Sequence, residues 1–196
     1  SVFPSTTTAA LSSLATACPP AIHGVLGHML WFEELGAVVN MLTFCPLGTD
    51  VPITEELVRR VPTIYERLRA AGVSSTLITD FAFEGTSFTN LLAEGARFAG
   101  YGGLSQISYQ LEQALAGAEG PAFYSLYWPL IDTLSHFHGP HHGDSPSSAC
   151  LEEMEFIDLM LGKVADICSR YGCTLAVVAD HGQTALRPEA AHSVQG

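Results

Sequence analysis

Charged side chains are scarce in this chain of 196 residues, and basic ones are the scarcest. Charged residues make up 14% of the sequence, and eight Lys and Arg stand against twenty Asp and Glu, which gives a formal net charge of −12. This balance argues against a nucleic-acid duplex or an anionic membrane as a general partner. No apolar run reaches the ~18 residues that a membrane-spanning helix needs, so we predict no membrane span.

Cysteine patterns are also lacking. The five cysteines are an odd number and form no C-x-x-C pair, which argues against a disulfide framework and against a thiolate zinc site. We expect buried free thiols. The odd number and the lack of a visible signal peptide favour a cytoplasmic location, although the sequence begins at Ser1 without an initiator Met. Nothing in the sequence indicates an oligomeric state.

Apolar residues are plentiful, at 47% of the chain, so residues 1–196 have enough material for the core of one domain. β-prone apolar runs predict buried strands at 73–79, 123–128 and 173–180. Helical periodicity predicts helices within 61–72, 104–117 and 151–170. Alternating helices and apolar strands indicate an α/β fold with a mostly parallel sheet. Residues 28–44 predict a hairpin at the edge of that sheet.

Histidines gather in one place: four of the eight lie between 136 and 142. Directly after the strand at 123–128, Asp132 and His136 are four residues apart, so a helical turn would put both on one face, where they could bind the same ion. Gly139 and Pro140 would end that turn. Taken alone, the run also suits a polar surface loop.

Two further clusters carry candidate chemistry. Asp180 and His181 end the run 173–180 and could converge on a cation in the turn that follows, although such a turn with a capping Asp is also common. Thr6, Thr7 and Thr8 precede the helix-forming run 9–17, so one threonine should cap that helix. A hydroxyl at such a helix start, near a metal ion, could become a nucleophile toward an anionic substrate. An ordinary Ser/Thr-rich cap is the simpler interpretation of the threonines alone.

The three clusters in this order resemble the type I phosphodiesterase/nucleotide pyrophosphatase family of the alkaline phosphatase superfamily. The likeness rests on "FPSTTTAALSSLATACPPAIHG", "YWPLIDTLSHFHGP" and "AVVADHGQ". It implies a partial catalytic domain with an alkaline-phosphatase-like three-layer α/β sandwich, lacking N- and C-terminal parts. Its expected activity is metal-dependent hydrolysis of phosphodiester or nucleotide pyrophosphate bonds in a small phosphate-ester substrate. The alternatives are a phosphomonoesterase or C–P hydrolase of the same superfamily, or a non-catalytic metal-binding remnant.

By this resemblance Thr7 is the nucleophile, with Thr6 and Thr8 as fallback candidates, and a phospho-threonine intermediate forms. Two divalent ions, expected to be zinc, are bound by Thr7 and four ligands: Asp132, His136, Asp180 and His181. His138, His141 and His142 are expected to lie outside the ligand set.

Several positions depart from the family pattern. The resemblance places one Asp ligand before Ser1 and one His ligand beyond Gly196, so we expect this chain alone to be inactive; His192 follows His181 too closely to be assigned. His28 stands near the family's phosphate-binding Asn, and Asn40 or His28 itself is a candidate replacement. Ser135 stands where a Gly is common, a change expected to be harmless.

Overall fold

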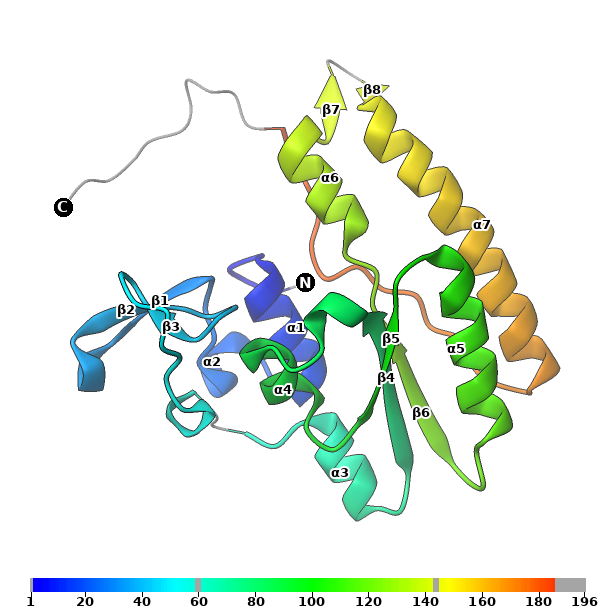
Figure 1. Cartoon of the computed structure of the whole chain (residues 1–196), viewed down its shortest axis with the longest axis horizontal. Helices are drawn as coiled ribbons and strands as arrows, with labels where there is room; N and C mark the ends of the chain where they lie inside the picture. Colours follow the sequence, from blue (N-terminus) through cyan, green and yellow to red (C-terminus); the bar gives the residue numbers. More distant parts are fainter. Residues whose placement is uncertain (1, 59–60, 143–144, 186–196) are drawn as a thin grey trace.

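The computed structural model describes residues 2–58, 61–142 and 145–185 (Figure 1). A parallel three-stranded sheet stands at its centre, in the order β5-β4-β6. Its strands are β4 (Ser74–Asp80), β5 (Arg97–Tyr101) and β6 (Ala122–Leu126). The predicted parallel sheet is therefore confirmed, and the runs 73–79 and 123–128 supply two of its strands; β5 was not predicted.

Helices cover both faces of this sheet, which gives three layers. Because side chains of a strand alternate between faces, β6 shows which helices lie where. Tyr124 and Leu126 pack into a core with α5 (Leu104–Ala116) and α7 (Ser148–Arg170). Phe123 meets Tyr65 of α3 (Ile64–Ala70), with ring centroids 6.0 Å apart. The fold is thus the expected α/β sandwich.

Local signals explain the helix boundaries. Thr63 caps α3 by accepting a hydrogen bond from Glu66 N at 3.1 Å, while Thr63 N donates to Glu66 Oε2 at 2.8 Å, a complete capping box. Gly72, at φ +76°, turns the chain after this helix into β4. In α7, Met160, Val164 and Ile167 recur at helical spacing and are buried against the sheet. The three predicted helices are confirmed.

The hairpin predicted at 28–44 exists, but its predicted place at the edge of the parallel sheet is wrong. β1 (Met29–Phe32) and β2 (Ala37–Asn40) pair antiparallel around the 3-10 turn Glu33–Leu35. With β3 (Cys45–Pro46) they form a separate sheet, which packs its own core against α4 (Ser87–Ala93). In Figure 1 this sheet stands away from β4, β5 and β6, so no backbone ladder joins the two.

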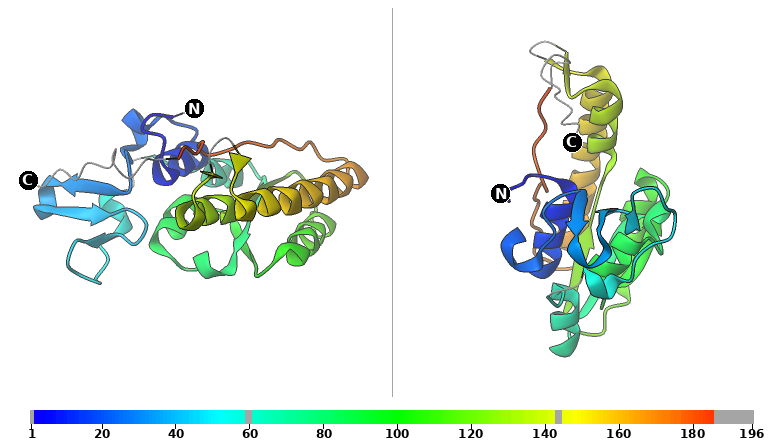
Figure 2. Two further views of the ribbon diagram at one scale, coloured as in Figure 1. Left: turned by 90° about the horizontal axis from the view of Figure 1, so that it is seen from above. Right: turned by 90° about the vertical axis from the view of Figure 1, so that its left-hand side faces the viewer.

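The strand predicted at 173–180 is the second error. Although its residues are apolar and β-prone, no ladder pairs them within the described parts of the chain, and Val177 and Val178 are 64% and 69% exposed. A strand needs a neighbour, and among the residues that the structure describes β6 pairs only with β4. After α7 the chain instead returns unpaired toward the start of α1 (Thr7–Thr16), as both views in Figure 2 show.

The remaining elements are short, apart from α6 (Leu130–His138). They comprise α2 (Pro20–His23), the 3-10 turns Glu55–Leu57 and Phe81–Phe83, and the two-residue strands β7 (His141–His142) and β8 (Ser145–Pro146).

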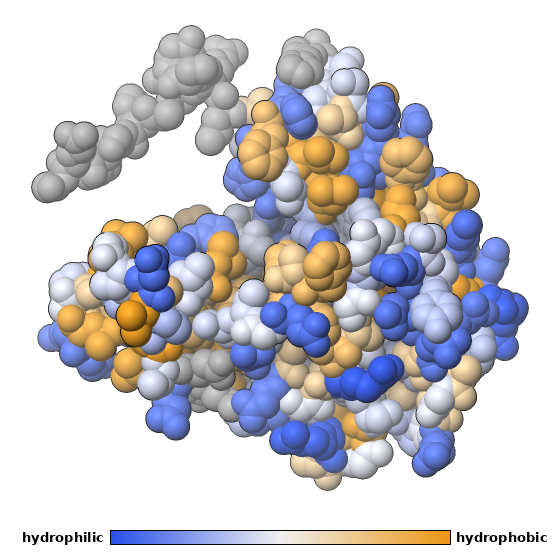
Figure 3. Space-filling model, viewed as in Figure 1, coloured by the Kyte–Doolittle hydropathy of each residue, from blue (hydrophilic) through white to orange (hydrophobic). Residues whose placement is uncertain are grey.

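Apolar residues remain on the face seen in Figure 3, both around α6 and α7 and over the small antiparallel sheet. Phe137, Leu159 and Trp31 are among the large exposed apolar side chains. No helix within the described residues is both long and apolar enough to cross a membrane.

Candidate active site

The start of α1 separates the three threonine candidates. Thr6 is the N-cap, and its hydroxyl accepts a hydrogen bond from Ala9 N at 3.4 Å. Thr8 is fully buried. Thr7 is the first helical residue, and its Oγ1 lies 3.0 Å from Nε2 of His181, across 174 residues of sequence. Of the three hydroxyls, that of Thr7 faces the second Asp-His motif.

Helix α6 carries the first Asp-His pair. Asp132 lies in its first turn and His136 in its last, and Asp132 Oδ2 is 3.4 Å from His136 Nε2. The helix ends at His138 because Gly139 adopts φ +72°. The predicted helical turn and its end are confirmed. The imidazole of His136 is 78% exposed, whereas the Asp132 side chain is 32% exposed.

Two contacts outside α6 hold its start in place. Trp128 stacks on Tyr101 of β5, with centroids 5.5 Å apart, and donates from Nε1 to Glu153 Oε1 of α7 at 2.6 Å. Tyr101 Oη donates to the carbonyl of Tyr127 at 2.7 Å. The segment between β6 and α6 is thereby tied to both the sheet and α7, which fixes where Asp132 emerges.

The second pair meets the first. His181 Nε2 is 3.6 Å from Asp180 Oδ2 and 3.9 Å from Asp132 Oδ1, and its side chain is 11% exposed. Asp180 Oδ1 accepts the backbone N–H of His181 at 2.9 Å. Thr7, Asp132, His136, Asp180 and His181 therefore gather at one place. Asp132 follows the carboxyl end of β6, the edge at which ligands bind in open α/β sheets.

The tautomer of His181 follows from its partners. Its Nδ1 lies 2.9 Å from the carbonyl oxygen of Gly182, which can only accept a hydrogen bond, so Nδ1 carries the proton. In the neutral ring Nε2 then has a lone pair, and the Thr7 hydroxyl donates to it. The ring is held as a metal-binding or proton-accepting imidazole is usually held, by a backbone carbonyl behind it.

His28 belongs to this neighbourhood, whereas no contact places Asn40 there. His28 interacts electrostatically with Asp132, His136 and His181, and its Nδ1 is buried without a hydrogen-bond partner within the described structure. Burial lowers the pKa of His28, and the charge of Asp132 partly opposes that shift. Asn40 instead uses its side-chain oxygen to accept from Leu42 N at 2.9 Å, a local turn.

The other histidines of the cluster lie elsewhere or outside the described parts. His138 and His141 are exposed. His192 falls outside the described residues, as does the side chain of His142. His23, which the sequence did not single out, is 3% exposed and has partners on both ring nitrogens, so it is a core histidine.

Sequence reasoning missed three side chains beside the site. The phenol of Tyr127 interacts with the charges of Asp180 and Asp132. Burial raises its pKa most, and these two carboxylates raise it further. Gln183 donates from Nε2 to Asp132 Oδ1 at 3.2 Å, and Ser135 donates to Gln183 Oε1. The position of Gln183 directly after the Asp-His-Gly turn was the available signal, but its partners are 48 and 51 residues away.

The side chains of the candidate site include the donor types that bind divalent metal ions in proteins. Within the described residues, no group of three or more His, Cys, Asp or Glu side chains already meets around one point as a metal site would. The donor types nonetheless suit a divalent ion, since Nε2 of the His181 imidazole lies within 4 Å of a carboxylate oxygen of both Asp132 and Asp180. The residue types therefore fit such ions chemically.

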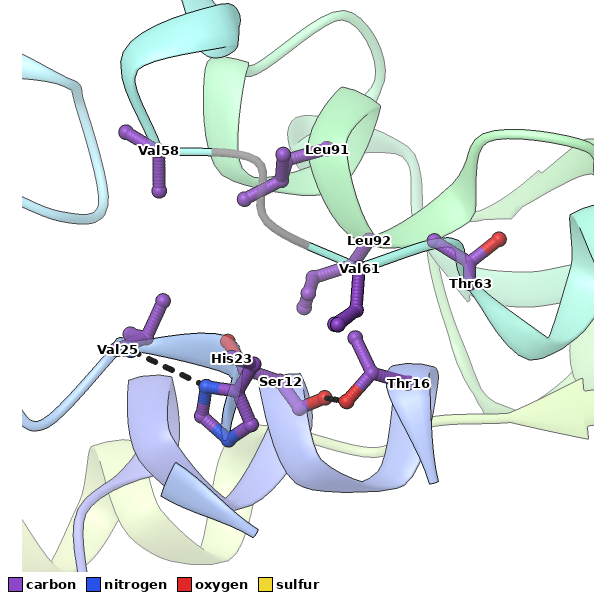
Figure 4. Close-up of a pocket in the computed structure, with 9 residues that line it drawn as sticks. All are labelled: Ser12, Thr16, His23, Val25, Val58, Val61, Thr63, Leu91 and Leu92. Atoms are coloured by element: carbon purple, nitrogen blue, oxygen red, sulfur yellow. Dashed lines mark hydrogen bonds between the residues drawn. The ribbon is translucent and has the colours of Figure 1, made fainter. Parts of the chain in front are cut away.

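A small cavity lies between α1, α4 and the loop before α3 (Figure 4). Its volume is about 20 Å³, and Ser12, Thr16 and His23 line it together with apolar side chains from α4 and the loop before α3. Ligand pockets usually measure hundreds of cubic ångströms. This cavity has room for about one water molecule, so it belongs to the core and does not serve as a substrate pocket.

A hydroxyl at a helix start and two Asp-His pairs beside a parallel sheet define an α/β domain of the alkaline-phosphatase-like class. The family model of type I phosphodiesterase/nucleotide pyrophosphatase matches residues 1–195. The chain therefore belongs to that family, as its motifs indicated. A search of curated protein sequences gives no match.

Solved structures show the same fold. Phosphonoacetate hydrolase from Sinorhizobium meliloti 1021, in complex with phosphonoformate, aligns with a TM-score of 0.54 at 18% identity, over 85% of this chain and 44% of that one. Murine ectonucleotide pyrophosphatase/phosphodiesterase 5, an inactive form with AMP, aligns with a TM-score of 0.60 at 15% identity, over 87% and 43%. The chain thus spans less than half the length of either protein.

Proposed function

We propose that this chain is the catalytic part of a metal-dependent hydrolase that cleaves phosphodiester or nucleotide pyrophosphate bonds through a phospho-threonine intermediate. The observation that carries the proposal is the 3.0 Å contact between Thr7 Oγ1 and His181 Nε2, which joins two motifs 174 residues apart. Family membership supports the same class of reaction.

Two divalent ions, for which we propose zinc, would lower the pKa of the Thr7 hydroxyl and offset the charge of the phosphoryl group. Asp180, His181 and Thr7 would hold one ion, and Asp132 and His136 the other. At the first ion, these residues provide two protein donors in addition to the Thr7 hydroxyl. At the second ion they provide two. Three protein ligands are usual at catalytic zinc, so we propose that the whole protein supplies the remainder.

Residues of this chain would supply the nucleophile and the contacts to the phosphoryl group. Thr7 Oγ1 stands at the N-terminus of α1, where free backbone N–H groups favour a phosphate. Its proton would pass to solvent as Oγ1 forms the new O–P bond, and the leaving oxygen would depart with the electrons of the bond that breaks. Water then attacks phosphorus, the O–P bond to Thr7 breaks, and the Thr7 hydroxyl recovers its proton. His28, which lies near Asp132, His136 and His181, would contact a phosphoryl oxygen in place of the amide that the family uses there.

The test uses the natural protein that carries this chain. Bound metal is measured by elemental analysis, and hydrolysis is measured on p-nitrophenyl diesters, p-nitrophenyl monoesters and phosphonoacetate. We expect two zinc ions per chain and a preference for diesters. A preference for monoesters or for phosphonoacetate would move the protein to another branch of the superfamily, and a protein without metal or turnover would refute the proposal.

Acid quenching during turnover examines the intermediate separately. Digestion and mass spectrometry should find one added phosphoryl or phosphodiester group on the peptide that contains Thr7. Thr6→Val should retain that signal, because Thr6 caps the helix and does not face His181. A modification on another residue would contradict the assignment of Thr7.

A further inference from the structure

Gln183 joins the two halves of the candidate site. It follows His181 by two residues, and its Nε2 donates to Asp132 Oδ1 of α6 at 3.2 Å. Its Oε1 accepts from the hydroxyl of Ser135, which lies on the same helix between Asp132 and His136. One side chain thus binds both α6 and the turn that carries Asp180 and His181. Within the described structure, no other side chain hydrogen-bonds residues of both.

The direction of each hydrogen bond follows from what the groups can donate. A carboxylate accepts only, so the amide must present its NH₂ group to Asp132. The carbonyl of Gln183 then faces Ser135 and can only accept. Ser135 has one hydroxyl proton. The carbonyl oxygen of Ile131 lies 2.8 Å from this hydroxyl and could accept the proton. Because the carbonyl oxygen of Gln183 can only accept, we assign the proton to the hydrogen bond with Gln183. The result is a chain of two hydrogen bonds, from the Ser135 hydroxyl to Gln183 and from Gln183 to Asp132, which we call the relay.

We propose that Gln183 and Ser135 are positioning residues, which hold Asp132 with Oδ1 occupied so that Oδ2 is presented toward His136, with which Asp132 would hold an ion. The observed separation of Asp132 Oδ2 and His136 Nε2 is 3.4 Å. This inference rests on the proposed metal-dependent function, but neither residue touches the ion or the substrate. Hydrogen-bond partners of metal ligands are worth about 10–100-fold in metal affinity or activity.

The relay also explains a serine that the family resemblance left without a role. A glycine at 135 would remove the hydroxyl, and the amide of Gln183 would lose the partner that fixes its orientation. Ser135 and Gln183 are therefore expected to act as one unit, in which the loss of either removes most of the effect of both.

The experiment uses the natural full-length protein and zinc as the ligand. Gln183→Met keeps the length of the side chain and removes both hydrogen bonds, Ser135→Ala removes the hydroxyl, and Ser135→Thr retains it. Thr184→Ala, at the exposed neighbouring residue, is the matched control. Zinc affinity is measured by competition with a chelator, and kcat and KM are measured separately.

We expect Gln183→Met to weaken zinc binding about 10–100-fold and to lower kcat with little change in KM. The double variant with Ser135→Ala should be no weaker than Gln183→Met alone, and Ser135→Thr and Thr184→Ala should match the wild type. Wild-type zinc affinity in Gln183→Met, or fully additive losses in the double variant, would overturn the relay.

A metal-free measurement keeps this inference separate from the proposed function. In the apo protein, Gln183→Met and Asp132→Ala should be non-additive in the urea midpoint of unfolding, because both remove the same hydrogen bond. Additive effects would refute the relay whether or not the protein binds zinc. Non-additive effects in a protein that binds no zinc would support the hydrogen-bond relay and refute the metal-dependent function.

Discussion

Replacement of His23 by Leu should destabilise the fold without touching the site. The ring is 3% exposed, and its Nδ1 accepts from Val25 N at 3.1 Å. Nε2 must then carry the proton, which it donates to Ser13 Oγ at 2.9 Å. Ser13 in turn donates to the carbonyl of Ala9 at 2.9 Å. His23 therefore links α1 to the turn that leads into the small sheet.

The magnitude follows from what the substitution leaves unpaired. Leu fills similar space, and Ser13 keeps its bond to Ala9, but the buried N–H of Val25 loses its acceptor. Such a group costs about 1–3 kcal/mol. For a chain of this size that corresponds to a melting temperature lower by about 2–12 °C, or to a urea midpoint lower by about 0.5–1.5 M if the denaturant slope is near 2 kcal/mol per M.

The pH dependence of this difference has a definite sign. Burial lowers the pKa of His23 from its ordinary value of 6.5, so the unfolded chain takes up a proton before the folded one does. The contribution of His23 to stability is complete above pH 6.5 and is lost as pH falls through the lower folded pKa. The gap between wild type and His23→Leu should be widest at pH 7.5 and should narrow at lower pH.

The assay is urea unfolding followed by tryptophan fluorescence, in which the partly buried Trp128, packed on Tyr101, is the reporter. His138→Leu, at an exposed histidine, is the control and should stay within about 0.5 kcal/mol of the wild type. Equal midpoints for wild type and His23→Leu at pH 7.5, or a gap that widens on acidification, would refute the reasoning.

Three further outcomes concern the site of the natural full-length protein. Thr7→Ala should abolish turnover while elemental analysis still finds most of the metal, and Thr7→Ser should retain part of the activity; wild-type turnover in Thr7→Ala would refute this. His28→Ala should raise the KM for a diester by about 10-fold, the value of one hydrogen bond of ~1.4 kcal/mol to a charged oxygen, without a change in bound metal, whereas a lost ion would make His28 a ligand. Replacement of His138, His141 and His142 by Asn together should leave metal stoichiometry unchanged, and a lost ion would refute their exclusion.

Much of the fold could be predicted from local sequence patterns. The helix predicted within 61–72, the periodicity of α7 and the turn at Gly139 are set by neighbours within a few residues, so the sequence shows them directly. Strand pairing is not local. The run 173–180 has the composition of a buried strand, yet its pairing depends on a partner that composition does not identify.

The candidate site divides in the same way. Asp132 and His136 could be paired from their spacing on one helix, and the family resemblance selected Thr7 from three adjacent threonines. Gln183 and Ser135 escaped because a glutamine or serine gains such a role only through one contact across the fold. Their residue types carry no chemical signal until the backbone brings them together.

The 174-residue separation between Thr7 and His181 has a consequence for the order of folding. Contacts of such long range form late, because the chain between them must be ordered first. α1 and α6 can form before the turn at 180–183 has docked. In such a partly folded molecule, the Thr7 hydroxyl does not contact the imidazole of His181. In the natural full-length protein, the proposed hydrolysis should therefore appear in the last kinetic phase of refolding, after native-like secondary structure has formed.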